Sequence, residues 1–271
     1  MQGEYRSPGA AASLLTCPQP WLIGVIHLPA LPGAPEATLP VNRIASDAVE
    51  DARRLADAGF TAVLLENFHD RPFRATRVDP ETVAAMAVVA ADVVRRVEIP
   101  VGVNVLRNDA LSALGIAAAA GAGFLRVNVL AGAAVTDQGL IQGDADRLLR
   151  RRAALGVDVA ILADVDVKHA TSLDTRPVTT RARELTGRAG ADAVLVTGEA
   201  TGSTPDNGML AAVHEAVLPT PVLAASGTTP DNLAALLGCC SGAIVGTSLQ
   251  DPATGRIDPE RAAAYVRASA S

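Results

Sequence analysis

The chain has 271 residues and a formal net charge of −6, and 49% of its residues are hydrophobic, 3% aromatic and 19% charged. This composition excludes an extensively disordered chain, and the few aromatic residues require a core built from Val, Leu, Ile and Ala. The negative charge argues against nucleic acid as a general partner, since Arg150 to Arg152 is the one basic run that stands out.

The sequence predicts a cytoplasmic protein. Cys17, Cys239 and Cys240 have neither the even number nor the spacing of a disulfide framework or a zinc site. The first twenty residues lack a basic start followed by an apolar run, so we expect no signal peptide. Every apolar run is broken before the roughly 18 residues that a membrane span needs, so we expect no membrane insertion.

Short runs rich in Val, Ile and Leu predict strands along the whole chain. Most of these runs are continuous rather than alternating, which is typical of strands buried on both faces of a parallel sheet. In chain order the predicted strands cover residues 22–27, 61–66, 101–105, 123–129, 159–163, 192–197, 222–226 and 242–247.

Helical patterns with capping signals lie between the predicted strands. The first starts at Ser46 and stops at Gly59, and Asp79-Pro80 gives a cap followed by Pro at the first helical position. The predicted helices cover residues 46–58, 79–97, 109–120, 144–155, 179–189, 205–217, 229–237 and 258–269.

Eight β-α units in about 250 residues predict an α/β fold, a closed (β/α)₈ TIM barrel. The barrel forms a single domain over residues 21–271, and residues 1–20 form an N-terminal tail. The alternative is an open doubly wound sheet, which needs a Gly-rich phosphate fingerprint after the first strand; residues 24–33 do not supply one.

Active sites of such barrels lie at the carboxyl ends of the strands, so the polar residues at those ends are the candidate site. Glu66 ends an apolar strand, and a partly desolvated carboxylate suits general acid-base catalysis. Asp164 ends the fifth strand, and Lys168, the single Lys of the chain, follows it. Lys168 could form an imine, donate a proton or bind an anion, or it could be an ion-paired loop residue. We predict these three residues as catalytic.

Further strand-end residues are predicted to bind the substrate. They are His27, Asn104, Asn128, His169 and Thr197. Asn128 could instead satisfy buried backbone, and His27 could be a structural hydrogen-bonding residue. Residues 136–143 are expected to form a polar loop that covers the site. No cofactor is indicated, although a divalent metal held by His27, Glu66, Asp164 and His169 is an alternative without support from motif spacing.

The loops after the last two strands predict a phosphate site. Barrels often bind phosphate there through backbone N–H groups, hydroxyls and a helix N-terminus. The residues that we expect to do so are Ser226, Gly227, Thr228, Gly246 and Thr247. Ordinary turns and helix caps are the alternative.

Several of these segments together resemble the BtpA family, which is named for a cyanobacterial protein of photosystem I biogenesis and includes SgcQ-type bacterial proteins. The matching stretches are GVIHLPALPGAP at 24–35, AGFTAVLLENFHDRPF at 58–73, PVGVNVLRNDA at 100–110, FLRVNVLAGAAVTDQGLIQG at 124–143, ILADVDVKHA at 161–170, VTGEATG at 196–202, ASGTTPDN at 225–232 and IVGTSL at 244–249. The resemblance implies a TIM barrel. It also implies a departure, because the family pattern carries Lys where this chain has Gln250 and Gly where it has Ala225.

These observations predict an enzyme whose ligand is a phosphorylated small molecule, either a sugar phosphate or a nucleotide-related compound. The chemistry expected is that of a lyase, an isomerase or an enzyme that cleaves a glycosyl bond. A non-catalytic assembly factor of the photosystem-biogenesis type and a metabolite-binding sensor are the alternatives. Ala-rich outer helices also suggest a homo-oligomer.

Overall fold

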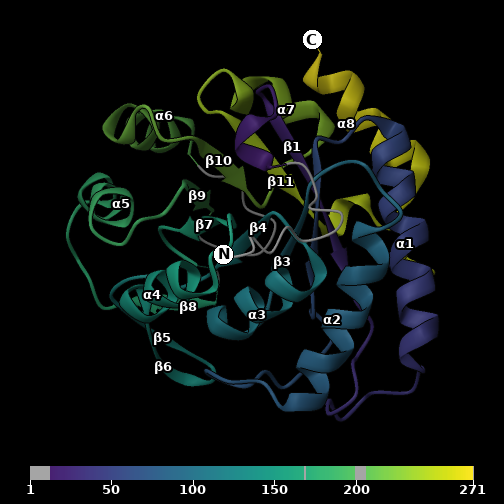
Figure 1. Ribbon diagram of the computed structural model, residues 1–271. Coiled ribbons are helices and arrows are strands. Elements are labelled where there is room, and N and C mark those ends of the chain that lie inside the picture. The colour runs from purple at the N-terminus through teal and green to yellow at the C-terminus, as the bar shows by residue number, and fades with distance from the viewer. Residues whose placement is uncertain (1–12, 168, 199–205, 271) are drawn as a thin grey trace, which may run out of the picture.

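Eight parallel strands close into one barrel in the computed structural model, which describes residues 13–167, 169–198 and 206–270. Around the barrel the strands follow the order β1-β11-β10-β9-β7-β4-β3-β2 (Figure 1). Their bounds are β1 Trp21–His27, β2 Ala62–Glu66, β3 Val101–Asn104, β4 Phe124–Val127, β7 Ala160–Asp164, β9 Ala193–Thr197, β10 Val222–Ala225 and β11 Gly242–Val245. This topology confirms the predicted (β/α)₈ barrel.

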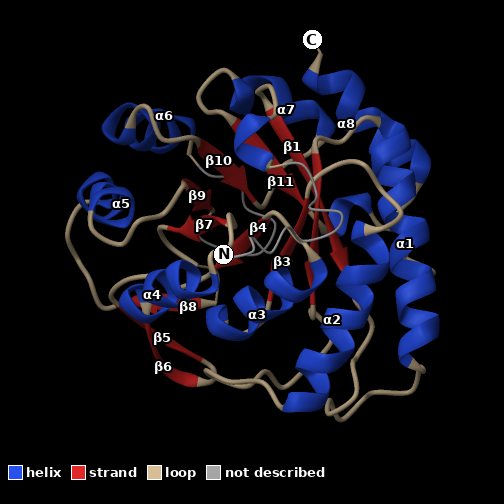
Figure 2. Cartoon of the chain, in the orientation of Figure 1, coloured by secondary structure: helices blue, strands red, loops and turns tan. Residues whose placement is uncertain are grey.

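The α-helices surround these strands (Figure 2). Their bounds are α1 Val41–Ala58, α2 Pro80–Val94, α3 Ala110–Ala120, α4 Ala145–Leu155, α5 Val178–Gly187, α6 Asn207–Val217, α7 Pro230–Leu237 and α8 Pro259–Ser269. The described residues also form two short 3₁₀ helices, η1 at Leu14–Thr16 and η2 at Thr247–Leu249. None of the helices in the described part of the chain has the length and apolarity to cross a membrane.

The start of α1 differs from the prediction. Ser46 was the expected cap, but the helix begins five residues earlier, at Val41. Pro40 precedes it in an extended conformation, and its carbonyl accepts from the backbone N–H groups of Arg43 and Ile44 at 3.0 and 3.2 Å. The prediction was wrong because the capping carbonyl belongs to a proline, which has no side-chain acceptor to signal it.

A small antiparallel sheet is added to the barrel in the order β6-β5-β8. Its strands are β5 Ala133–Thr136, β6 Gly139–Gln142 and β8 Ala170–Ser172. Most of residues 136–143, expected to be a loop, therefore forms the turn and second strand of a hairpin. The loop prediction was wrong because it read the polar turn residues and missed the cross-strand pair Val135–Leu140.

Apolar side chains fill the inside of the barrel. Trp21, Ile23 and Val25 of β1 belong to this interior cluster, together with Leu14, which lies in the segment expected as a tail. Phe124 of β4 also belongs to it, and its ring lies where Gly102 of β3 has no side chain: a Cβ there would meet ring atoms at 2.2 Å. Small residues on one strand thus make room for the few aromatic residues of the chain.

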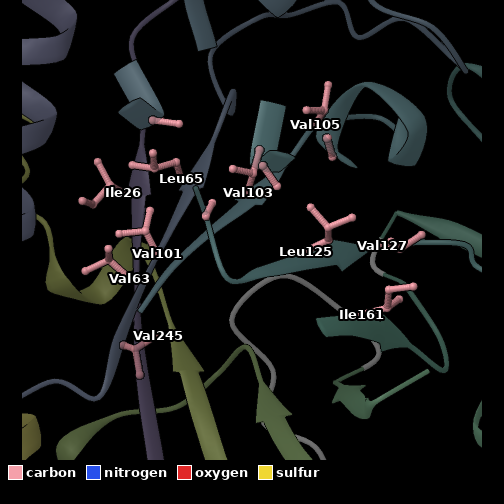
Figure 3. Packing of buried hydrophobic residues seen from close by; sticks show 14 of the residues in the cluster. Ile26, Val63, Leu65, Val101, Val103, Val105, Leu125, Val127, Ile161 and Val245 are labelled. Atoms are coloured by element: carbon pink, nitrogen blue, oxygen red, sulfur yellow. The ribbon is translucent and has the colours of Figure 1, made fainter. Parts of the chain in front are cut away.

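The opposite faces of the strands pack under the helices. Val63 and Leu65 alternate with the interior residues of β2 and belong to the larger outer cluster (Figure 3). Both faces of each strand are therefore buried, which explains the continuous apolar runs of the sequence.

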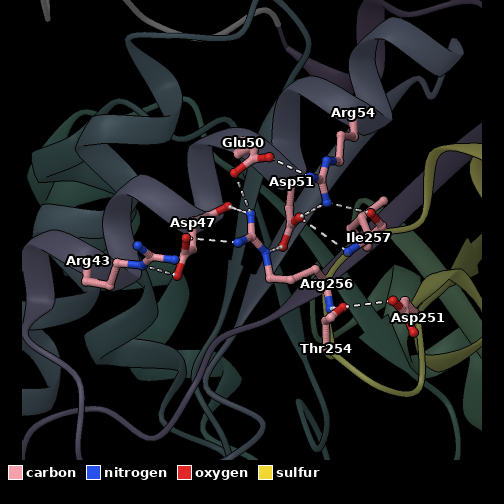
Figure 4. A network of polar contacts seen from close by, with 9 residues as sticks. All are labelled: Arg43, Asp47, Glu50, Asp51, Arg54, Asp251, Thr254, Arg256 and Ile257. Atoms are coloured by element: carbon pink, nitrogen blue, oxygen red, sulfur yellow. Dashed lines mark hydrogen bonds and ion pairs between the residues drawn. The ribbon is translucent and has the colours of Figure 1, made fainter.

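The first and last units of the barrel are joined by strands and by charges. β1 pairs in parallel with β11. Arg256, in the segment before α8, contacts three acidic residues of α1: its Nε lies 2.8 Å from Asp51 Oδ2, its Nη1 2.9 Å from Asp47 Oδ1 and its Nη2 3.2 Å from Glu50 Oε2 (Figure 4). The buried carboxylate of Asp51 also accepts from the backbone N–H of Ile257 at 3.2 Å.

Candidate functional site

Polar residues occupy the last inward-facing position of several barrel strands. On β2 the interior residues Ala62 and Leu64 are followed two positions later by Glu66, and on β7 Leu162 is followed by Asp164. Since side chains of a strand alternate between faces, these carboxylates lie above the apolar interior, at the mouth. The same alternation brings four further side chains to this mouth: Asn104 on β3, Arg126 and Asn128 on and after β4, and Thr197 on β9.

Arg126 is the centre of the group. Its Nε and Nη2 donate to Asp164 Oδ2 and Oδ1, both at 3.1 Å, in a bidentate pair. Its Nη1 lies 3.8 Å from Glu66 Oε2. Burial by itself lowers the pKa of Arg126, but the negative charges of Asp164 and Glu66 more than offset this and raise it. Arg126, whose side chain is 13% exposed, therefore joins the two predicted catalytic carboxylates.

Asp164 has both carboxylate oxygens engaged. In addition to Arg126, Asn128 Nδ2 donates to its Oδ2 at 2.9 Å, and the side chain has no exposed surface. Asn128 Oδ1 is buried and has no hydrogen-bond partner among the described residues. Asp164 thus fixes the orientation of Asn128, and the free carbonyl oxygen of Asn128 is left to accept from a ligand or a water.

Glu66 is held by one oxygen only. Asn104 Nδ2 donates to its Oε2 at 3.0 Å, and β2 and β3 place the two residues side by side in register. No hydrogen bond to Oε1 occurs within the described part of the chain. Glu66 therefore offers one oriented oxygen at the mouth while Asn104 and Arg126 hold the other.

His27 lies in the wall between β1 and β11. Its ring stacks on Phe68 with centroids 4.1 Å apart, and a Cβ on Gly246 would lie 3.3 Å from its Nε2. Burial lowers the pKa of His27, whereas Glu66 and a hydrogen bond with Gln250 act in the opposite direction. The absence of a side chain at Gly246, which was predicted as a phosphate ligand, therefore leaves room for this imidazole.

The added sheet extends to the mouth. Ala134 and Ile141 of the hairpin pack with Val129, which follows β4 directly. Arg107 is 8% exposed, and burial lowers its pKa, while the charges of Asp164 and of Asp137 in the hairpin turn raise it. The hairpin thus lies close enough to the site to influence a buried arginine there.

The two predicted phosphate loops are connected by Tyr265 of α8. Its hydroxyl donates to the Thr228 carbonyl at 2.6 Å and lies 2.7 Å from Ser248 Oγ. Thr228 is 3% exposed, and its Oγ1 has no hydrogen-bond partner in the part of the chain that the structure describes. A buried hydroxyl without a partner costs about 1–3 kcal/mol, which favours a ligand or a water at this point.

Ser226 has an unusual backbone. Its φ is 78°, and Gly227 follows with φ 62°. Non-glycine residues rarely adopt this left-handed region, and such strain is found mostly at functional sites. Its Oγ accepts from the Gly198 N–H at 3.3 Å, so that the residue connects the ends of β9 and β10.

The N-terminus of α7 is closed by its own cap. Thr229 Oγ1 accepts from the Asn232 N–H, and Asn232 Oδ1 accepts from the Thr229 N–H at 2.8 Å. Pro230 has no N–H to offer. The sequence offered two interpretations of this helix N-terminus, a phosphate site and an ordinary helix cap. The structure shows the cap.

The remaining predicted residues are spread around the mouth. Thr197 Oγ1 donates to the Asp166 carbonyl at 2.6 Å and holds the segment after β7. His169 and Thr247 are exposed. Lys168 lies outside the described residues. Among the described residues no group of three or more His, Cys, Asp or Glu side chains could hold a metal, and Arg126 stands between Glu66 and Asp164.

Three residues that organise the site were not among the predicted catalytic or binding residues: Arg126, Arg107 and Tyr265. Arg126 is one of the polar strand-end residues, but the sequence assigned it no role. A signal was available for Arg126, because an arginine within an apolar strand is costly to bury unless it is paired. Tyr265 gave no such signal, since an aromatic residue on a helix is ordinarily read as core.

Comparison with known proteins confirms the family resemblance. The model of the BtpA family matches residues 19–271. The photosystem I biogenesis protein BtpA of Synechocystis is 44% identical over 251 residues, which cover 92% of this chain and 88% of that protein. An uncharacterized protein of Pyrococcus abyssi is 43% identical over 230 residues, covering 85% and 87% of the two chains.

Solved structures show the same fold at low sequence identity. The N-(5'-phosphoribosyl)anthranilate isomerase of Pyrococcus furiosus superposes with a TM-score of 0.59 at 13% identity, covering 92% of this chain and 98% of that one. The (S)-3-O-geranylgeranylglyceryl phosphate synthase of Thermoplasma acidophilum, in complex with sn-glycerol-1-phosphate, gives 0.58 at 15% identity, with 94% of each chain covered. At this identity the likeness extends to the barrel alone.

Proposed function

The chain belongs to the BtpA family, and from that premise we propose that it is an enzyme acting on a phosphorylated small molecule at the mouth of the barrel. The ligand class is a sugar phosphate or a nucleotide-related compound, and the chemistry is that of a lyase, an isomerase or a glycosyl-bond-cleaving enzyme. Two enzymes of the same fold support the ligand class: N-(5'-phosphoribosyl)anthranilate isomerase, and (S)-3-O-geranylgeranylglyceryl phosphate synthase, whose substrate is sn-glycerol-1-phosphate.

The observation that carries the proposal is the environment of Glu66. Asn104 fixes one of its oxygens at 3.0 Å, Arg126 lies 3.8 Å from the same atom, and the second oxygen makes no hydrogen bond within the described chain. An oxygen without a protein partner at the mouth can accept from a substrate group. A general acid or base needs one oriented oxygen with access to a substrate proton, which is what Glu66 provides.

The other members of the cluster position the substrate and the catalytic group. Asp164 holds Arg126 and Asn128 and has no free oxygen, so it acts through them as a positioning residue. Asn128 accepts a hydroxyl or amine proton of the substrate through Oδ1. Arg126 stabilises negative charge that develops beside Glu66.

The phosphate is held at the opposite wall, by Ser226, Gly227, Thr228, Gly246 and Thr247. The unpartnered Thr228 hydroxyl and the left-handed backbone of Ser226 support this assignment. His27, Thr197 and His169 complete the surroundings of the substrate.

Lys168 forms an imine with the substrate if the mechanism uses covalent catalysis. Borohydride reduction during turnover should then attach the substrate to Lys168 and increase the mass of the peptide that contains it. If a substrate that is turned over gives no such adduct, the imine mechanism is rejected.

Thermal unfolding against a ligand panel tests the proposal. The panel contains sugar phosphates, nucleotides and inorganic phosphate, each with and without Mg²⁺. A ligand at 100 times its dissociation constant stabilises the folded protein by about 2.7 kcal/mol. We expect a shift with at least one phosphorylated compound, its loss in Ser226→Asp, and its retention in Glu66→Gln, which instead loses turnover. A folded wild type without any shift rejects the phosphate site.

A second candidate function is an assembly factor without catalysis, and it is favoured by the similarity to the photosystem I biogenesis protein of Synechocystis. The two functions differ in their dependence on Glu66. A cellular phenotype of deletion that Glu66→Gln rescues as fully as wild type supports the assembly factor. Failure of this folded variant to rescue supports the enzyme.

A further inference from the structure

Helices α2, α3 and α4 lie next to one another on the outside of the barrel (Figure 1). Residues of these helices and of the segment before α2 line a groove there. This groove has a volume of about 1000 Å³. Its floor is apolar, formed by Val83 and Ala87 of α2 and by Leu111 and Ile116 of α3. None of the strand-end residues of the candidate site lines it, so the groove is a separate feature of the molecule.

Small residues create the groove. Ala84, Gly115 and Ala119 line it from α2 and α3, and a Cβ added to Gly115 would meet no atom within 4 Å. α4 contributes Leu148 as its one fully buried side chain, so it does not fill the space next to α3. The stretch of α3 from Leu111 to Ala119 spans about 12 Å, or roughly two turns of a docked helix.

The rim of the groove is strongly basic. Four arginines line it: Arg77, Arg147, Arg150 and Arg151. No acidic residue of the described chain does so, although the net charge of the protein is −6. Arg147 pairs with Asp144 at 2.9 Å, whereas the other three form no ion pair within the described residues.

Arg152, the third residue of the basic run, has a structural role instead. It donates to Asp192 at 2.8 Å and to the Val159 carbonyl at 3.0 Å. Of the three arginines at positions 150–152, Arg152 therefore contacts the fold, whereas Arg150 and Arg151 line the groove.

We infer that this groove docks an acidic amphipathic helix of a partner protein. Apolar side chains of that helix fill the alanine-rich floor, and its carboxylates pair with the arginines of the rim. The complementary charges fix the register and increase the association rate. A single-stranded nucleic acid fits less well, because the described residues of the lining include no aromatic side chain on which a base could stack.

Fluorescence anisotropy with a defined probe tests the inference. The probe is a labelled synthetic 18-residue helix with leucines along one face and glutamates on the other. Two control peptides have the same leucine stripe with lysines for glutamates, and the same composition in scrambled order. We expect saturable binding of the acidic helix to the full chain, weaker at higher salt, and at least about 10-fold weaker binding of both controls.

Two variants assign the binding to the groove. Arg150→Glu/Arg151→Glu reverses the rim, and Gly115→Leu fills the floor at an exposed helical position where leucine favours the helix. Both are expected to weaken binding at least 10-fold, while the charge-matched Arg53→Glu/Arg188→Glu, at exposed sites outside the groove, binds as wild type. The inference is overturned if the wild type does not bind the acidic helix, if both groove variants bind it normally, or if a single-stranded oligonucleotide binds there in its place.

Discussion

At the scale of single residues, Arg126 is the cation that pairs with both carboxylates of the mouth. Removing Arg126 leaves Asp164, whose side chain has no exposed surface, and Glu66, whose side chain is 8% exposed, without their shared partner. Breaking a buried ion pair on one side costs about 3–5 kcal/mol, because the remaining charge is desolvated and unpaired. We expect Arg126→Met to lower the free energy of unfolding in urea by this amount.

The matched control for this prediction is an ion pair whose arginine is exposed and whose carboxylate keeps Arg256 as a second partner. Arg43 is 63% exposed and pairs with Asp47 at 2.9 Å, and such surface pairs contribute at most about 1 kcal/mol. Arg43→Met should therefore cost little. If the two variants lose the same stability, the buried pair does not organise the mouth as described.

The pH dependence of stability should report on His27. Burial lowers its folded-state pKa below the unfolded value of 6.5, so the unfolded chain takes up a proton first as the pH falls. Stability therefore rises with pH between the folded-state pKa and about 6.5, and it is lost as the pH falls through this window. In His27→Gln the urea midpoint should change less between pH 7.5 and 5.5 than it does in the wild type. Part of the change should remain, because burial also lowers the pKa of His69. Parallel curves for the variant and the wild type would contradict the assignment.

At the scale of elements, the sequence indicated the parallel strands, the helices and the strand-end position of Glu66, Asn104 and Asp164. These follow from local periodicity and from the rule that active sites lie at the carboxyl ends of barrel strands. The central role of Arg126 did not follow, because its partners come from β2 and β7, which are distant from it in sequence. The hairpin did not follow either, since strands as short as β5 and β6 give too few alternations to detect.

The start of α7 separates capping from ligand binding. Thr229 and Asn232 form a reciprocal capping box. Ser226 has the strained backbone, and the Thr228 hydroxyl has no hydrogen-bond partner among the described residues. Thr229→Ala should lower the free energy of unfolding by about 1 kcal/mol, as the loss of an N-cap does. It should leave the ligand-induced shift in melting temperature intact, unlike Ser226→Asp. Loss of the ligand shift in Thr229→Ala would instead assign the threonine to the phosphate site.

At the scale of the whole molecule, the barrel is a ring that must close between its first and last units. Strand pairing between β1 and β11 supplies one joint, and Arg256 supplies a second on the outside, with contacts to Asp47, Glu50 and Asp51 of α1. The side chain of Asp51 is 7% exposed, and its burial raises the pKa of its carboxyl, against the lowering effect of Arg256. Arg256 therefore compensates a charge that the fold has buried.

Loss of this second joint should weaken the closed ring as one unit. We expect Arg256→Met to lower the free energy of unfolding by about 3 kcal/mol, against less than about 1 for Arg95→Met at an exposed pair. If closure is cooperative, the urea midpoint falls while the m-value stays constant, because the same surface is still exposed in one transition. A decreased m-value, with faster hydrogen exchange confined to α1 and α8, would show instead that the barrel opens locally at this seam before the remainder unfolds.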